Sequence, residues 1–110
     1  MLEVSKKQFS EIEENIAKQA LQTAHQREVS ALVSQVRDRA NTITELEDLW
    51  YLHDLLSTKR YEIDGKYVYN RSTLVFDFAR LVQEGWLDLD DLSGLPSAML
   101  SKISVLARMS

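Results

Sequence analysis

The sequence predicts an all-α protein with a single domain over residues 1–110, built around one long N-terminal helix. The first observation is that its 110 residues include only 3 Gly and 1 Pro, too few turn-forming residues for many short strands. The second is that hydrophobic residues make up 45% of the chain, which is enough for one compact core. The third is a stretch from Phe9 to Ala40 that contains neither Gly nor Pro.

The long helix is predicted from the spacing of its apolar residues. They recur every three to five positions, which is typical of one amphipathic helix: Phe9, Ile12, Ile16, Ala20, Ala24, Val29, Leu32, Val33, Val36 and Ala40. Ser10 followed by Glu13 predicts a capping box at the start. A helix of about 30 residues is about 45 Å long, more than one small domain can cover. We therefore expect a second copy of the chain to cover Leu32, Val33 and Val36.

A second helix is predicted to begin at Thr44-Glu45-Leu46-Glu47, another capping pattern, and to end at Asp64-Gly65. At 100° per residue, five aliphatic side chains share one arc and are expected to fill a core: Leu49, Leu52, Leu55, Leu56 and Ile63. Residues 61–69 could instead form a β-hairpin around Asp64-Gly65, because their flanks are rich in strand-forming residues.

Two further helices complete the predicted architecture. Asn70 or Ser72 caps a third helix, which Gly85 ends as the residue after the cap. A short turn over residues 88–92 then leads past Pro96 to the last helix. That helix carries its apolar stripe on Met99, Leu100, Ile103, Leu106 and Ala107.

Composition argues against several classes of function. The net charge is −4 and the pI about 5.1, which is the wrong sign for a nucleic-acid-binding protein. The chain has no Cys and 2 His, so we expect no thiol chemistry and no metal site. The longest apolar run, residues 49–52, is too short to span a membrane, and the first residues lack a signal-peptide pattern, so we expect a soluble intracellular protein.

The second predicted helix also has an aromatic, polar and charged face. Trp50, His53, Asp54 and Arg60 lie there, away from the leucine arc. In one interpretation Trp50 packs under the first helix or against a second copy, and the polar groups satisfy one another. In the other the face is a protein-binding hot spot, since Trp and Arg carry much of the energy of interfaces. A small hydrolase using His53 and Asp54 is a weaker alternative, because neighbouring residues on a helix point about 100° apart.

Phe76 falls outside the apolar arc of the third helix, among charged and polar residues. We interpret it either as an exposed contact residue or as a ring covered by the loop over residues 66–70. Lys102 flanks the stripe of the last helix, where its charge can serve solubility or a partner contact.

A resemblance to a known family rests on motifs spread along most of the chain. They are Asp48-Leu49-Trp50-Tyr51-Leu52-His53-Asp54-Leu55-Leu56-Ser57-Thr58-Lys59-Arg60, Glu62-Ile63-Asp64-Gly65-Lys66-Tyr67, Leu81-Val82-Gln83-Glu84-Gly85, Ser101-Lys102-Ile103 and Leu106-Ala107-Arg108, with Phe76 and Gln26-Arg27-Glu28. In this combination the chain resembles the fluorescence recovery proteins of cyanobacteria. Tyr51, Trp86 and residues 67–69 depart mildly from the family pattern.

The resemblance implies an all-helical homodimer without a cofactor. It has a long-helix dimerisation region over about residues 1–64, which forms a stalk, and a compact helical C-terminal head over about residues 65–110. Such a protein binds the photoactivated, red orange carotenoid protein, mainly through that partner's C-terminal domain. It speeds reversion to the orange form and detachment from the phycobilisome, which ends non-photochemical quenching. The implied location is the cytoplasm, near the cytoplasmic face of thylakoid membranes.

The resemblance also assigns residues. Trp50, His53, Asp54 and Arg60 match the family's functional patch near the dimer interface, to which Trp50 also belongs. Phe76 and Lys102 match the head region implicated in partner contact. The alternative outside this family role is a helical dimeric regulator of an unrelated protein, such as an anti-repressor.

Overall fold

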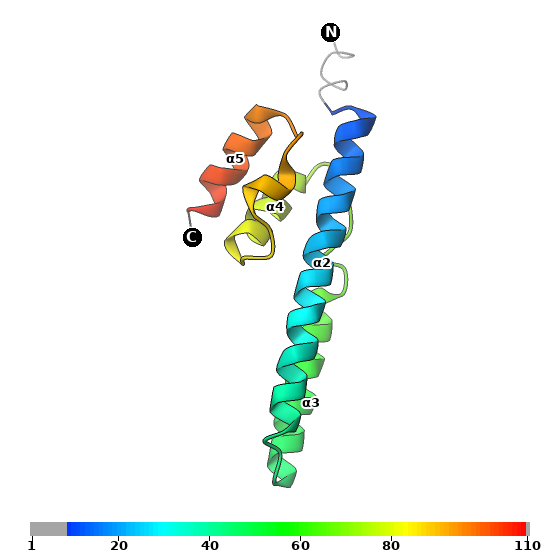
Figure 1. Ribbon diagram of the computed structural model, residues 1–110, viewed down its shortest axis with the longest axis vertical. Helices are drawn as coiled ribbons and strands as arrows, with labels where there is room; N and C mark the ends of the chain where they lie inside the picture. Colours follow the sequence, from blue (N-terminus) through cyan, green and yellow to red (C-terminus); the bar gives the residue numbers. More distant parts are fainter. Residues whose placement is uncertain (1–8, 110) are drawn as a thin grey trace.

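The computed structural model describes residues 9–109, and every element in that range is helical (Figure 1). The elements are α2 (Glu11–Ala40), α3 (Leu46–Ile63), α4 (Leu74–Gln83), the 3₁₀ helix η1 (Leu89–Leu92) and α5 (Ser97–Ala107). The predicted all-α class is therefore confirmed. The alternative hairpin over residues 61–69 is wrong, because α3 continues to Ile63 and a turn follows it. Within residues 9–109, no helix is long and apolar enough to cross a membrane.

The long helix begins as its sequence predicts. Ser10 is the N-cap of α2: its Oγ accepts a hydrogen bond from the Glu13 N–H at 3.1 Å, and its own N–H donates to Glu13 Oε1 at 2.7 Å. This reciprocal pair satisfies two N–H groups that the helix itself leaves open. The 30 residues of α2 dominate the shape of the molecule, whose longest dimension is 64 Å.

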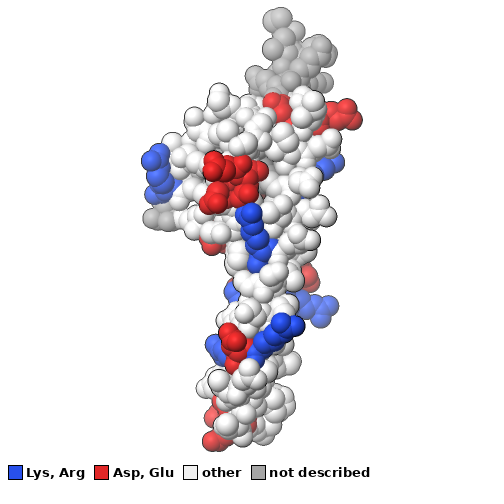
Figure 2. All heavy atoms as spheres, viewed as in Figure 1, with Lys and Arg blue, Asp and Glu red and all other residues white. Residues whose placement is uncertain are grey.

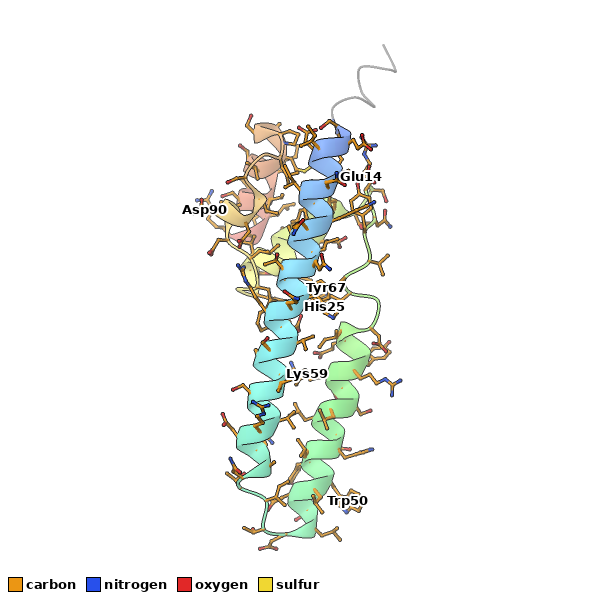
Figure 3. The ribbon with its side chains drawn as sticks, turned by 45° about the vertical axis from the view of Figure 1, so that its right-hand side comes forward. Glu14, His25, Trp50, Lys59, Tyr67 and Asp90 are labelled. Atoms are coloured by element: carbon orange, nitrogen blue, oxygen red, sulfur yellow. The ribbon has the colours of Figure 1, made fainter. Side chains whose placement is uncertain are left out.

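Helix α3 runs back along the second half of α2, so that the two helices form a stalk (Figures 1 and 3). Its N-cap is Glu45 rather than the predicted Thr44. The reason is Asp48, whose carboxylate accepts hydrogen bonds from the backbone N–H groups of Thr44 and Glu45, both at 3.1 Å. These bonds also lower the pKa of Asp48. Asp64 follows the last residue of α3, as predicted.

The head consists of α4, η1 and α5, which lie beside the first half of α2 (Figure 1). The N-cap of α4 is Thr73, not the predicted Asn70 or Ser72. The side-chain oxygen of Asn70 instead accepts hydrogen bonds from the N–H of Ser72 at 3.0 Å and from its hydroxyl at 2.7 Å. Asn70 therefore stabilises the turn before the helix, because a short amide side chain readily bonds the backbone two residues on.

Gly85 ends α4, as predicted. It adopts a φ of 88°, a conformation that residues with a Cβ rarely take. Its N–H donates to the Val82 carbonyl at 3.0 Å, and the Trp86 N–H donates to the Leu81 carbonyl at 2.9 Å. This Schellman arrangement turns the chain sharply towards η1.

The core lies between the first half of α2 and the head. Its buried residues are Ala17, Ala20, Leu21, Ala24, Leu74, Phe78, Ala79, Leu81, Leu87, Leu92, Leu95 and Ile103. Helix α2 contributes mostly alanines, so the larger side chains of the head pack closely against its backbone.

The expectation that the leucine arc of α3 fills a core is wrong for the single chain. No residue of α3 is buried, and Leu49 and Leu56 remain 45% and 40% exposed. The reason is that α3 packs mainly against α2, and a hairpin of two helices encloses too little space to cover a whole apolar arc.

Candidate functional site

The aromatic and polar side chains of α3 lie on its solvent side. We call Trp50, His53, Asp54 and Arg60 the stalk face. Trp50 is 57% exposed, and the other three side chains are more exposed still. Packing of Trp50 under α2 is therefore wrong within one chain, while its packing against a second copy stays a prediction.

Only some of the charged groups on the stalk face pair with one another. His53 Nδ1 lies 3.4 Å from Asp54 Oδ1, whereas Arg60 turns to Asp64, with 3.8 Å between Nε and Oδ2. Such exposed pairs contribute about 0–1 kcal/mol each, so they leave the groups available to a partner. An acid–base mechanism needs a base held in place beside its proton partner. Two exposed side chains with one long contact lend the hydrolase alternative no geometric support.

Apart from Trp50 on α3, the residues predicted at the dimer interface lie along the second half of α2. Val33 is 44% exposed, and Leu32 and Val36 are half-buried. The exposed aliphatic side chains of the stalk, over α3 and the second half of α2, are Val29, Val33, Leu46, Leu49 and Leu56. We call this set the apolar stalk residues.

Phe76 and Lys102 lie together on the head. They line one groove of about 590 Å³ between α4 and α5, which we call the head groove; its other lining residues are Ser72, Val75, Ser101, Val105 and Leu106. Phe76 is 65% exposed, so the interpretation that the loop over residues 66–70 covers it is wrong. The head groove thus combines an exposed aromatic ring and an exposed cation on an apolar floor.

Sequence reasoning missed the aliphatic part of the head groove. Val75 from α4 and Val105 from α5 flank Phe76 and Lys102 there. The sequence could show that Lys102 and Val105 lie near each other, because residues three positions apart share one side of a helix. It could not show that α4 packs against α5, which is what forms the groove.

The two candidate surfaces do not meet within one chain. Figure 3 shows Trp50 close to the end of the stalk that lies farthest from the head. Along α3, Trp50 and Arg60 are about 15 Å apart. The structure therefore brings Phe76 and Lys102 together but leaves them separate from the stalk face.

Sequence reasoning also missed a buried ionic cluster where the stalk meets the head. Lys66 Nζ donates to Glu28 Oε1 at 2.9 Å and to Glu84 Oε1 at 2.7 Å, and the side chains of Lys66 and Glu28 are only 7% and 9% exposed. The Tyr67 hydroxyl also donates to Glu28, while its ring stacks on His25 with 4.8 Å between centroids (Figure 3). Burial, reinforced by the bond to Glu28, raises the pKa of Tyr67. The only sequence signal was that Glu28, Lys66, Tyr67 and Glu84 fall in the family-like motifs.

Between residues 9 and 109, no three His, Asp or Glu side chains gather closely enough to hold a metal ion.

Comparison with known proteins identifies the family to which the chain is similar. Residues 9–107 match the family model described as photoprotection regulator fluorescence recovery protein. The chain is 41% identical over 109 residues to the fluorescence recovery protein of Synechocystis sp. (strain ATCC 27184 / PCC 6803 / Kazusa), covering 99% of this chain and 100% of that one.

Solved structures agree with this match. The structure of the Fremyella diplosiphon fluorescence recovery protein is similar with a TM-score of 0.86 and 54% identity, over 92% of this chain and 99% of that chain. The Synechocystis sp. PCC 6803 structure also has a TM-score of 0.86, with 43% identity over 91% of this chain and 98% of that chain.

Proposed function

The chain belongs to the fluorescence recovery protein family of photoprotection regulators, and we propose that it binds the photoactivated, red orange carotenoid protein, mainly at that protein's C-terminal domain. Binding accelerates the return to the orange form and detachment from the phycobilisome. Fluorescence then recovers and non-photochemical quenching ends. The proposed place of action is the cytoplasm, near the cytoplasmic face of thylakoid membranes.

The observation that carries this proposal is the head groove. An exposed Phe76 beside Lys102 offers a large apolar area and a charge in one place. Interfaces draw most of their energy from a few such residues, which are buried when a partner binds. We propose the head groove as the principal contact for the carotenoid protein, with Lys102 pairing with an acidic group of the partner.

The proposed mechanism is non-covalent. A bound protein speeds another protein's relaxation only if it binds the barrier state more tightly than the starting state. In this scheme the head groove provides affinity, and the stalk face makes the contacts that differ between the red and orange forms. Its exposed side chains are available for such contacts, because their own ion pairs are weak.

A homodimer is part of the proposal. The apolar stalk residues are exposed on a two-helix hairpin, and no other element in residues 9–109 buries them. A second copy that packs on this surface removes its apolar area from water. Trp50 lies on the same helix as Leu49 and joins the edge of this interface in our proposal.

The test is the rate at which orange absorbance returns in the dark after illumination of a carotenoid protein. We expect the rate to rise with the concentration of the wild-type chain, and the Phe76→Asp variant to lose most of this effect. Val68→Asp is the matched control, because Val68 is 61% exposed and does not line the head groove. If the wild type accelerates no carotenoid protein, the proposal fails, and the alternative of a dimeric regulator with an unrelated partner replaces it.

A further inference from the structure

The head rests on α2 through an apolar contact to which α2 contributes mainly small side chains. Three of the four buried apolar residues of α2 are alanines, Ala17, Ala20 and Ala24, and the fourth is Leu21. Helices usually lock together when ridges of large side chains fit into grooves. Alanines form low ridges, so apart from Leu21 and Ile16, which lies close to Gly94, α2 offers few large side chains to fix the position of the head.

Arg27 supplies a polar contact on one side of the head. Its Nη1 donates to Asp91 Oδ2 at 2.8 Å and to the Trp86 carbonyl at 3.0 Å, and its Nη2 lies 3.3 Å from Asp91 Oδ1. The hydrogen bond from Arg27, with one from the Asp88 N–H, lowers the pKa of Asp91. Two parallel hydrogen bonds between the planar guanidinium and the planar carboxylate fix both the distance between Arg27 and Asp91 and the relative orientation of the two groups. Figure 2 shows acidic and basic groups side by side on this part of the surface.

Glu28 supplies a second polar contact through Lys66. Lys66 joins Glu28 of α2 to Glu84, the residue that caps the C-terminal end of α4. Glu84 is held further by Arg80, with 2.9 Å between Nε and Oε2. Although burial by itself opposes it, these hydrogen bonds from Lys66 and Arg80 keep the pKa of Glu84 below its usual value.

Both contacts converge on the same turn. Glu84 and Trp86 flank Gly85, so Glu28 reaches one side of the Gly85 turn through Lys66, and Arg27 bonds the other side directly. Consecutive residues of a helix point about 100° apart, which is why two neighbours on α2 can hold one turn from two directions.

We infer that Arg27 and Glu28 are positioning residues that hold the Gly85 turn on α2 and so fix the head in one register along the stalk. Ionic and polar groups are known to select one register among several of similar apolar packing. The functional consequence rests on the proposed function: the register sets the distance between the head groove and the stalk face, which must reach one partner together.

Distance measurement between two spin labels tests the register directly. The sequence contains no Cys, so Thr58→Cys on α3 and Ser97→Cys on α5 provide two unique and exposed labelling sites. Labelled chains are diluted in an excess of unlabelled chains, so that distances within one chain dominate. Pulsed electron paramagnetic resonance then gives the distribution of distances between stalk and head.

We expect one narrow distance in the wild type and a second or broadened population in the double variant Arg27→Met/Glu28→Gln. Arg27→Met alone is expected to broaden the distance distribution less. The Arg27 side chain is 46% exposed, so this single variant is expected to fold, and it decides the test if the double variant does not fold. Arg27→Lys keeps the charge but not the two-pronged geometry, and we expect an intermediate result. Arg37→Met is the matched control on α2, with an unchanged distance expected.

The second readout is the rate at which the orange absorbance of the carotenoid protein returns in the dark. We expect this rate to be several-fold lower with the double variant than with the wild type, while far-UV helicity stays unchanged. An unchanged distance distribution in the variants would overturn the inference, and so would equal broadening in Arg37→Met. If the wild type accelerates no carotenoid protein, the proposed function fails, but the distance measurement still decides the role of Arg27 and Glu28.

Discussion

Phe76 of α4 and Lys102 of α5 face the same groove on the head, although they are far apart in the sequence. The pair exists because α4 and α5 pack side by side and each leaves one of these side chains exposed beyond the core. The relationship places an aromatic anchor next to a cation, and the consequences of removing either can be measured.

Phe76→Asp is expected to weaken binding of the red carotenoid protein by about 2 kcal/mol, or about 30-fold in Kd, by replacing an apolar anchor with a charge. Helicity by far-UV circular dichroism and the dimeric state are expected to stay unchanged, because the ring is exposed. A large fall in Tm would contradict this prediction, since it would mean that Phe76 belongs to the core. Val68→Asp serves as the control for an added charge.

Val33→Glu or Leu32→Glu is expected to convert the protein to a monomer. Each would bury a carboxylate in the proposed interface, where an unpaired charge is strongly unfavourable. Sedimentation velocity at micromolar concentration measures the change, and Ser34→Glu, at an exposed neighbouring position, is the control. A monomeric wild type at that concentration would rule the proposed dimer out.

Arg60→Leu and Asp54→Leu are expected to fold and dimerise, yet to return the orange spectrum several-fold more slowly than the wild type at equal concentration. Both side chains are exposed on α3, so their loss is expected to remove the proposed partner contacts and to leave the core intact. Thr58→Leu, an exposed residue of α3 outside the stalk face, controls for added apolar surface. If the two variants accelerate recovery as well as the wild type, the family assignment stands but the stalk face is not the site.

Gly94→Ala is expected to lower the free energy of unfolding by about 1–3 kcal/mol. Gly94 has a φ of 103°, and a Cβ atom there would lie 2.6 Å from Ile16 Cδ1. Chemical denaturation measures the change. Ile16→Val removes that methyl group, so the double variant separates the steric clash from the backbone strain. We expect partial rescue, and a fully additive loss would show that the clash is not the cause.

Asp91 is expected to make the stability depend on pH. Its folded pKa is held below the usual value of 3.8 by the hydrogen bonds from Arg27 and the Asp88 N–H. The unfolded chain therefore binds a proton first as the pH falls, so the contribution is present above about pH 4 and is lost as the pH drops through the folded pKa.

Urea denaturation at several pH values between about 7 and 3 tests this dependence. Asp91→Asn is expected to be less stable than the wild type at neutral pH, with a difference that shrinks on acidification. Asp90→Asn on the same 3₁₀ helix is the control, because Asp90 lies outside the contact with Arg27. A difference between wild type and Asp91→Asn that stays constant with pH would contradict the proposed ionic contact.

The sequence by itself determined the helices and most of their ends, because these depend on neighbours within a few positions. Ser10 with Glu13 started α2, and Gly85 ended α4, as local hydrogen bonding dictates. Thr44 is not the cap for an equally local reason, because the Asp48 carboxylate accepts the backbone N–H groups of Thr44 and Glu45 and the helix begins after Glu45. The off-core position of Phe76 also followed from periodicity alone.

Only the tertiary structure decided what each face of a helix meets. The leucines of α3 have the periodicity of a core yet remain exposed in the single chain, because burial depends on which element lies opposite. Glu28 and Lys66 are 38 positions apart, and no local rule pairs them. Two opposite charges become a buried cluster only when the chain folds back and removes both from water together, and that is a property of packing, not of sequence spacing.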